Sequence, residues 1–151
     1  MKKSIEYKKP FFKEVSEHLF QILNKSQNGI TITDPNQNDN PIVFANKAFC
    51  NTFGYSLDEI INKNCRFLHK YNTNQQEIID IKKSITNKES ITTILRNYKK
   101  DGTEVFIELL ISPIFDENKN LKYFLGIQKD ITKDKRFVEQ MKISQSLANI
   151  G

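Results

Sequence analysis

A short run in the middle of the chain, Asn64 to His69, brings together side chains that can do chemistry. It reads Asn-Cys-Arg-Phe-Leu-His, so it holds an amide, a thiol, a guanidinium and an imidazole. The Cys65 thiol can react when it loses or transfers its proton, and the planar guanidinium of Arg66 suits a phosphate. The imidazole of His69 can change charge near neutral pH. This run is therefore the first candidate for a functional site.

Metal binding by this run would need ligands that the sequence does not provide. Cys65 and His69 lie four residues apart, and the second cysteine, Cys50, lies elsewhere. Zinc sites take at least three protein ligands, so we expect no metal. The sequence also contains no Gly-rich phosphate loop, nucleophile elbow or His-Glu-x-x-His motif. We therefore expect that the chain is not itself an enzyme.

The elements before this run are predicted to be a helix and a hairpin. After Pro10, apolar residues recur at three- and four-residue spacing from Phe11 to Leu23, which predicts one amphipathic helix. Residues 29–33 and 42–45 are short apolar stretches on either side of the polar turn 36–41. This arrangement predicts two strands that pair as a hairpin.

Short helices are predicted around the run. Asn46 is a suitable N-cap for a helix that Gly54 would end. Ser56 and Glu59 match a capping box that would begin another helix. A third helix is predicted from Gln75 to Ile85, because its isoleucines share one face.

The last third of the chain has the period of β-strands. Residues 90–100 alternate with period two, and the turn Lys100-Asp101-Gly102 follows them. Val105 to Ile111 predicts a second strand that Pro113 would close, and Tyr123 to Asp130 predicts a third. Two strands, a helical stretch and three hairpin strands predict an α+β fold with a five-stranded antiparallel sheet and helices on one face.

The two flanks of this core are predicted to be helical. We expect an N-terminal arm and helix over residues 1–27, a core over 28–132 and a C-terminal linker helix over 133–151. The last segment carries a loose apolar stripe from Phe137 to Ile150. This helix either packs on its own domain or acts as a coiled-coil linker that pairs two copies.

The composition limits the partners of the chain. Its 151 residues fit one domain, and the formal net charge of +5 comes from lysines scattered among acidic residues. The basic residues 1–9 could bind nucleic acid, but no nucleic-acid-binding motif accompanies them, so we expect a solvated arm and no nucleic-acid partner. Two cysteines are too few for a disulfide framework, and no apolar stretch is long enough to span a membrane. We therefore expect a cytoplasmic chain without membrane contact.

Six segments together resemble the LOV (light-oxygen-voltage) domains of the PAS family. The LOV signature reads Asn-Cys-Arg-Phe-Leu-Gln, and five of its six positions match here, with His69 as the departure. The other matching segments, in the family's order, are 33–35, 40–43, 54–56, 97–102 and 126–128. The resemblance extends from about Gly29 to Thr132 and implies the PAS fold.

The resemblance implies FMN as cofactor and Cys65 as the photoreactive residue. In that family, blue light leads to a reversible bond between the cysteine and the flavin. The family pattern places Asn64 at the ribityl chain and Arg66 at the phosphate, with Lys82 in place of a second phosphate arginine. Leu68 and His69, which complete the signature, are expected at the cofactor as well.

The resemblance also assigns residues to the flavin ring. Asn97 and Gln128 match the family's ring-edge amides, and Thr31 and Thr33 lie on the first strand near the reactive edge. Three apolar residues are expected to pack against the ring: Leu109, Ile111 and Phe124. Gln128 is in addition the expected signal switch, because its amide can rotate when the facing flavin nitrogen changes from acceptor to donor.

Two departures from the family pattern bear on flavin binding and recovery. Ile107 stands where the family has a second ring-edge asparagine, so we expect the flavin to lack one hydrogen bond there. His69 either replaces one hydrogen-bonding group by another or acts as a base that speeds dark recovery.

The resemblance implies that this is a sensor that signals through its flanking helices. The expected partners are flavin, a second copy bound through these helices, and an effector domain or kinase. Two other functions stay open from the residues: a flavin-binding redox sensor, and a PAS dimerisation module with a vacant pocket.

Overall fold

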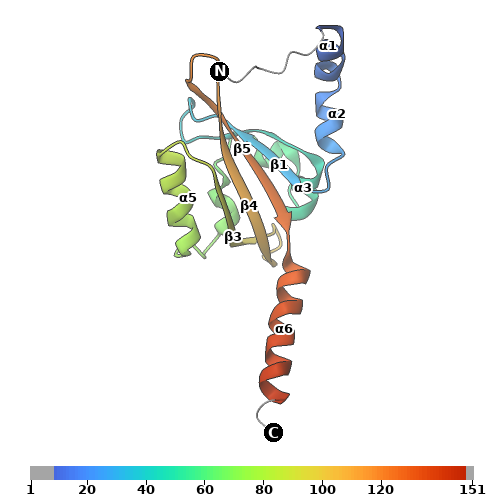
Figure 1. Cartoon of the computed structure of the whole chain (residues 1–151), viewed down its shortest axis with the longest axis vertical. Helices are drawn as coiled ribbons and strands as arrows, with labels where there is room; N and C mark the ends of the chain where they lie inside the picture. The colour runs from blue at the N-terminus through green and yellow to red at the C-terminus, as the bar shows by residue number, and fades with distance from the viewer. Residues whose placement is uncertain (1–8, 149–151) are drawn as a thin grey trace, which may run out of the picture.

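Alternating apolar and polar residues produce five strands that pair into one antiparallel sheet. The structure is a computed structural model, and it describes residues 9–148. The strands are β1 (Gly29–Thr33), β2 (Ile42–Ala45), β3 (Ile91–Tyr98), β4 (Glu104–Phe115) and β5 (Leu121–Asp130). Their order across the sheet is β2-β1-β5-β4-β3, so the first and last strands of the core lie side by side at its centre (Figure 1). This confirms the predicted five-stranded antiparallel sheet.

Helices pack against one face of this sheet. They are α3 (Lys47–Phe53), α4 (Leu57–Ile60), the 3-10 helix η1 (Cys65–His69) and α5 (Gln76–Thr86). The predicted cap forms, because the Asn46 side chain accepts a hydrogen bond from the Phe49 backbone N–H, and Gly54 ends α3 with a left-handed φ of 79°. The arrangement is the α+β PAS fold that the resemblance implied.

The hydrophobic core fills the space between this face and the helices. Phe49 and Phe53 of α3 are fully buried, with ring centroids 4.8 Å apart. Ile42, Ile60 and Ile107 are also fully buried. The core cluster extends from β2 and α3 to β3, β4 and α5, and some of its members, such as Leu95 and Leu109, also line a cavity between the sheet and the helices.

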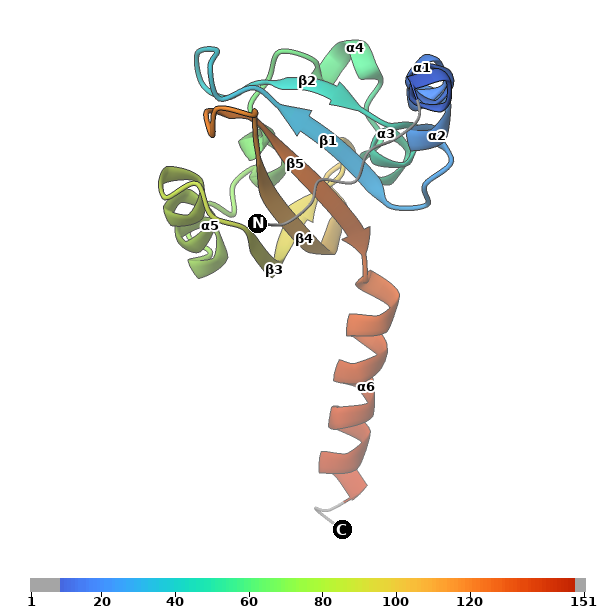
Figure 2. The ribbon, with the colours of Figure 1, turned by 45° about the horizontal axis from the view of Figure 1, so that its top comes forward.

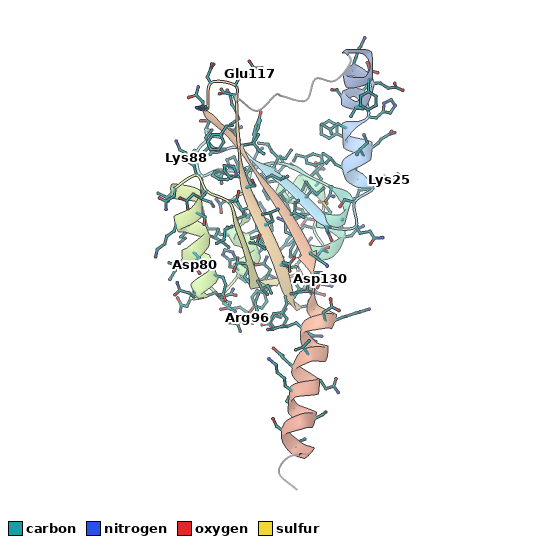
Figure 3. All side chains as sticks on the ribbon, viewed as in Figure 1. Lys25, Asp80, Lys88, Arg96, Glu117 and Asp130 are labelled. Atoms are coloured by element: carbon teal, nitrogen blue, oxygen red, sulfur yellow. The ribbon has the colours of Figure 1, made fainter. Side chains whose placement is uncertain are left out.

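The flanking helices lie outside this core. They are α1 (Lys9–Glu17), α2 (Leu19–Asn24) and α6 (Thr132–Ala148). In both views α6 continues from the end of β5 and projects away from the sheet (Figures 1 and 2). Asp130, labelled in Figure 3, lies where the sheet meets this helix.

The prediction of one continuous N-terminal helix was wrong. The helix breaks at His18, whose ring nitrogen Nδ1 lies 2.9 Å from the Glu14 carbonyl oxygen. The backbone N–H of His18 bonds to the Val15 carbonyl instead. The side chain thus occupies the acceptor that a continuous helix would need for its backbone.

Two smaller predictions also need correction. Pro113 does not close its strand, because β4 continues to Phe115. β3 begins opposite Ile111, so at Pro113 the β4 strand has one neighbour only, and an edge position tolerates a missing N–H. Ser56 precedes α4, but its hydroxyl bonds to the Glu59 carboxylate rather than to a backbone N–H.

Some predictions concern residues that the structure does not describe. The basic arm falls almost entirely in residues 1–8, and the C-terminal stripe ends at Ile150, so both lie partly outside the described range. Within residues 9–148, no helix has the length and apolar character needed to cross a membrane. The same part of the chain holds no cluster of three or more His, Cys, Asp or Glu side chains suited to a metal ion.

Candidate functional site

A cavity of about 720 Å³ lies between the sheet and the segment that carries η1 and α5. Its volume is in the range of about 300–1,000 Å³ that is usual for small-molecule sites. Every residue that the resemblance assigns to the cofactor lines it: Thr33, Asn64, Cys65, Arg66, Leu68, His69, Lys82, Asn97, Leu109, Ile111, Phe124 and Gln128. The fold therefore brings these residues together, although their roles toward a cofactor stay predictions.

The two walls of this cavity differ in chemistry. The strand wall consists of Thr31, Thr33, Leu95, Asn97, Leu109, Ile111, Phe124, Leu125, Gly126 and Gln128. The helix wall consists of Asp39, Asn40, Asn64, Cys65, Arg66, Leu68, His69, Lys70, Ile78, Ile81, Lys82 and Ile85. The strand wall is apolar with a few neutral polar groups, whereas the charged residues belong to the helix wall. A ligand that contacts both walls therefore meets neutral groups on one side and charged groups, of which Asp39 alone is acidic, on the other.

The strand wall holds polar atoms without hydrogen-bond partners. Asn97 and Gln128 are 3% and 5% exposed, and the Asn97 Oδ1 and Gln128 Oε1 atoms are unpaired. The Thr33 hydroxyl on the same wall and Asn40 Oδ1 on the opposite wall are also buried and unpaired. Each such atom costs about 1–3 kcal/mol. The cavity is therefore shaped for a ligand that bonds to these atoms.

Strand register explains why these amides face the cavity. Asn97 pairs with Val105, and Gln128 pairs with Gly29 on one side and Leu109 on the other. Side chains alternate between faces along a strand, so the amides share the face of the buried apolar residues. The alternation in the sequence predicted this orientation, and the burial of both amides confirms it.

The thiol of Cys65 lies at the start of η1 on the helix wall. Asn64 precedes it as the N-cap, and the Asn64 Oδ1 atom accepts a hydrogen bond of 3.0 Å from the Arg66 backbone N–H. Part of the Cys65 surface is open to the cavity, yet burial among protein atoms raises the pKa of its thiol to about 12. The thiol is therefore protonated at neutral pH, which suits proton transfer from sulfur and disfavours thiolate redox chemistry.

Arg66 is engaged with a residue that sequence reasoning missed. Its Nη1 atom donates to Asp39 Oδ1 at 2.9 Å, and its Nη2 atom bonds to the other carboxylate oxygen. This guanidinium holds the pKa of the Asp39 carboxyl below its usual range. Asn64 Nδ2 also donates to the Asp39 carbonyl oxygen at 2.7 Å. Asp39 sits in the polar turn between β1 and β2, where no sequence pattern distinguishes it from its neighbours.

Burial, with a smaller contribution from nearby positive charge, lowers the pKa of His69. The pKa of its imidazole is lowered by burial first and by the charges of Lys82 and Arg66 second. Lys82 lies on α5, and its side chain is exposed where it borders the cavity. These cations give the helix wall an affinity for an anionic group such as a phosphate.

Ile107 lies apart from the cavity lining. It is fully buried in the hydrophobic core and pairs with Leu95 across β3 and β4. The expectation that it leaves one polar atom of a ligand unpaired stays a prediction.

Comparison with known proteins identifies relatives of this chain. A model of the PAS domain family matches residues 27–133. A blue-light photoreceptor of Listeria monocytogenes is 42% identical over 132 residues, which is 87% of this chain and 51% of that protein. A blue-light-activated histidine kinase of Brucella ovis is 40% identical over 118 residues, which is 78% of this chain and 24% of the kinase. This chain thus spans about half of the first relative and about a quarter of the second.

Solved structures of light-oxygen-voltage proteins are also similar to this chain. An RNA-binding light-oxygen-voltage receptor superposes with a TM-score of 0.82 at 26% identity, covering 98% of this chain and 42% of that one. A light-oxygen-voltage domain studied with a flavin analogue superposes with a TM-score of 0.72 at 32% identity, covering 87% of this chain and 98% of its own.

Proposed function

Since the chain belongs to the PAS domain family, in its LOV branch, we propose that it senses blue light through a flavin that reacts reversibly with Cys65. The observation that carries this proposal is the cavity, whose lining includes the Cys65 thiol on one wall and, on the other, two amide residues with unpaired buried oxygens. We further propose that residues 28–132 form the sensory core, and that residues 1–27 and 133–151 flank it.

The residues of the cavity fit a flavin. Asn97, Gln128 and Thr33 offer buried polar atoms to the edge of a planar ring, and Phe124 and Leu109 offer apolar surface to its face. Arg66 and Lys82 would hold a terminal phosphate, so FMN is the flavin that we propose.

The proposed chemistry uses the proton of Cys65. A bound flavin would supply an excited state that blue light populates and that reacts with a thiol. Cys65 would provide the sulfur for a reversible bond to the flavin and would pass its thiol proton to the same ring, so that no other oxidant or reductant would be consumed. In the dark Cys65 would regain this proton when the bond breaks. A thiol pKa of about 12 keeps this proton in place before illumination.

The absorption spectrum of purified protein before and after blue light tests this proposal. We expect a visible flavin band that disappears on illumination and returns in the dark. Cys65→Ala should retain the band and lose the bleaching, whereas the matched control Cys50→Ala should keep both, because Cys50 packs against the core outside the cavity. A flavin band that does not bleach would indicate a redox sensor, and absence of flavin would indicate a dimerisation module.

The structure supports Gln128 as the start of a route to the C-terminal helix. Gln128 lies on β5, two residues before Asp130, whose Oδ1 atom accepts from the Thr132 backbone N–H at 2.9 Å. The Thr132 hydroxyl in turn accepts from the Phe106 backbone N–H at 3.0 Å, which links the first residue of α6 to β4. A shift of β5 relative to β4 would therefore change the bonds that hold the first turn of α6.

We expect Gln128→Leu to bleach under blue light but to lose the light-induced change in α6. Hydrogen exchange of the α6 amides in the dark and under light measures this change, because exchange reports local opening. If the α6 amides still respond in Gln128→Leu, the switch lies at another residue.

We propose that two copies pair through the flanking helices and pass the signal to an effector domain or kinase. Exposed apolar side chains on α2 and α6 support this proposal, namely Leu19, Phe20, Ile22, Val138, Ile143 and Leu147. The kinase of Brucella ovis gives an example of a relative that is named as a light-activated kinase. Light scattering should give the mass of a dimer, and a monomer at high concentration would contradict the pairing.

A further inference from the structure

The hydroxyl of Thr31 is the hydrogen-bond partner of the Gln128 amide. Gln128 Nε2 donates to Thr31 Oγ1 at 3.1 Å, between β5 and β1. Thr31 is 2% exposed and Gln128 is 5% exposed, so water does not compete for this bond. Both residues line the cavity. Sequence reasoning singled out Gln128, but it assigned no partner to the amide.

Two glycines leave the space that the Gln128 amide occupies. Gly126 lies opposite Thr31, and a Cβ atom at Gly126 would come within 2.4 Å of Thr31 Oγ1 and 3.0 Å of Gln128 Nε2. On the other side, a Cβ at Gly29 would lie 3.2 Å from Gln128 Oε1. A side chain at either position would therefore come too close to one end of the Gln128 amide. The bond between Thr31 and Gln128 thus depends on glycine at both positions.

We propose that Thr31 is a positioning residue, which holds the Gln128 amide in the orientation that leaves Oε1 free to accept a hydrogen bond. The inference rests on the proposed function, in which the flavin nitrogen N5 gains a proton when Cys65 reacts. The unpaired Oε1 atom is an acceptor for that proton, and Thr31 engages the Nε2 end of the same amide. The hydroxyl thus favours the orientation that the reacted state requires.

The chemistry of a hydroxyl makes Thr31 suited to this role. The hydroxyl oxygen accepts from Nε2 and so holds that end of the amide while Oε1 stays free. A valine has nearly the same shape but has no acceptor for Nε2. Thr92 lies on β3, is exposed and does not line the cavity. Thr92→Val is therefore a control for the same substitution away from the site.

Dark recovery after blue light provides the first test. We expect Thr31→Val to recover about three- to tenfold faster, which is the factor for one lost hydrogen bond. Thr31→Ser should recover within about twofold of the unaltered protein, because it keeps the hydroxyl. In a Gln128→Leu background the effect of Thr31→Val should vanish, because a positioning residue acts through the residue that it holds. A slower or unchanged recovery, or an effect that persists without Gln128, would overturn the proposal.

The side-chain amide resonances of Gln128 provide a second test, which does not depend on photochemistry. In dark protein labelled with ¹⁵N, the Nε2 protons should exchange slowly with water, and Thr31→Val should speed their exchange while Thr92→Val does not. Assignment follows from the resonances that Gln128→Leu removes. Equal exchange in the two valine variants would contradict the bond. The protein could fail to bleach under blue light while Thr31→Val still speeds the exchange of the Nε2 protons. This result would contradict the proposed photochemistry but not the positioning role of Thr31.

Discussion

The strand wall and the helix wall of the cavity satisfy their polar groups in opposite ways. On the strand wall, Asn97 Oδ1, Gln128 Oε1 and the Thr33 hydroxyl are buried without partners. On the helix wall, the exposed guanidinium of Arg66 is already paired with Asp39, and among the described residues of this wall only Asn40 has a buried polar atom, Oδ1, without a partner. The strand wall therefore leaves more of its polar atoms unpaired than the helix wall does until a ligand binds.

This difference teaches where ligand affinity arises. A ligand that bonds to the strand wall removes a cost that the folded protein already carries, about 1–3 kcal/mol for each unpaired atom. A phosphate at the helix wall must instead compete with the Asp39 carboxylate for Arg66, and exposed ion pairs contribute little in water. We therefore expect the flavin ring to determine affinity and the phosphate to adjust it.

The largest expected effect is on the strand wall. Asn97→Leu should weaken flavin binding about ten- to hundredfold. The ring loses its hydrogen bond to the amide, and binding no longer provides a partner for a buried acceptor of the protein. The ligand-free variant should at the same time unfold at a higher temperature, since an unpaired buried acceptor is gone. Flavin fluorescence titration and thermal unfolding measure the two changes.

A second leucine variant shows whether the loss of flavin affinity is specific to Asn97. Thr92 lies on the same strand as Asn97 and is exposed on the other face, so Thr92→Leu should leave flavin affinity unchanged. If Asn97→Leu binds flavin as tightly as the unaltered protein, the unpaired atoms of the strand wall are not the source of affinity.

A smaller effect is expected on the helix wall. Asp39→Asn should release Arg66 and strengthen FMN binding about two- to fivefold, in line with the energy of exposed ion pairs. Riboflavin, which has no phosphate, should bind equally well before and after the change. Titration with both flavins gives the comparison. Weaker FMN binding by Asp39→Asn would show that the carboxylate orients Arg66 instead of competing for it.

The smallest expected effect concerns His69. Burial and the charges of Lys82 and Arg66 lower its pKa from the ordinary value of 6.5, so the unfolded chain takes up a proton more readily than the folded protein does. The folded state should therefore lose stability as the pH falls below 6.5, down to the lowered pKa. His69→Gln should remove this loss. Urea unfolding of ligand-free protein on either side of this range measures it.

Dark recovery gives a second measurement at the same residue. If His69 acts as a base, recovery should slow as the imidazole takes up a proton in acid, and His69→Gln should remove this dependence. A recovery rate that does not change with pH would leave His69 as a simple replacement for a hydrogen-bonding group.

Local patterns predicted the elements of this fold well. Alternation placed Asn97 and Gln128 on the buried face, and the spacing of isoleucines placed a helix within one residue of α5 (Gln76–Thr86). The prediction failed where a tertiary or side-chain contact decided the outcome. The predicted N-terminal helix breaks at His18, whose ring nitrogen contacts the Glu14 carbonyl oxygen. Pro113 is tolerated within β4 because β3 does not extend far enough to pair with it.

The candidate site was predictable where the residue type alone restricts the chemistry. Cys65 and Arg66 are such residues, and both line the cavity. Asp39 was not found, and Thr31 was placed near the reactive edge without its bond to Gln128, because both contacts depend on partners that the fold brings close. Thr31 bonds to a residue 97 positions away, and no pattern in the sequence links the two.

The contact between Thr31 and Gly126 also restricts the order in which this site can evolve. A methyl group at Gly126 would lie 2.4 Å from Thr31 Oγ1, so Gly126→Ala is unfavourable while threonine is present. After Thr31→Ala the same change would meet mainly the end of the flexible Gln128 side chain. Divergence at these two positions is therefore epistatic: the change at Thr31 must come first, and a lineage that keeps the hydroxyl is confined to glycine on the facing strand.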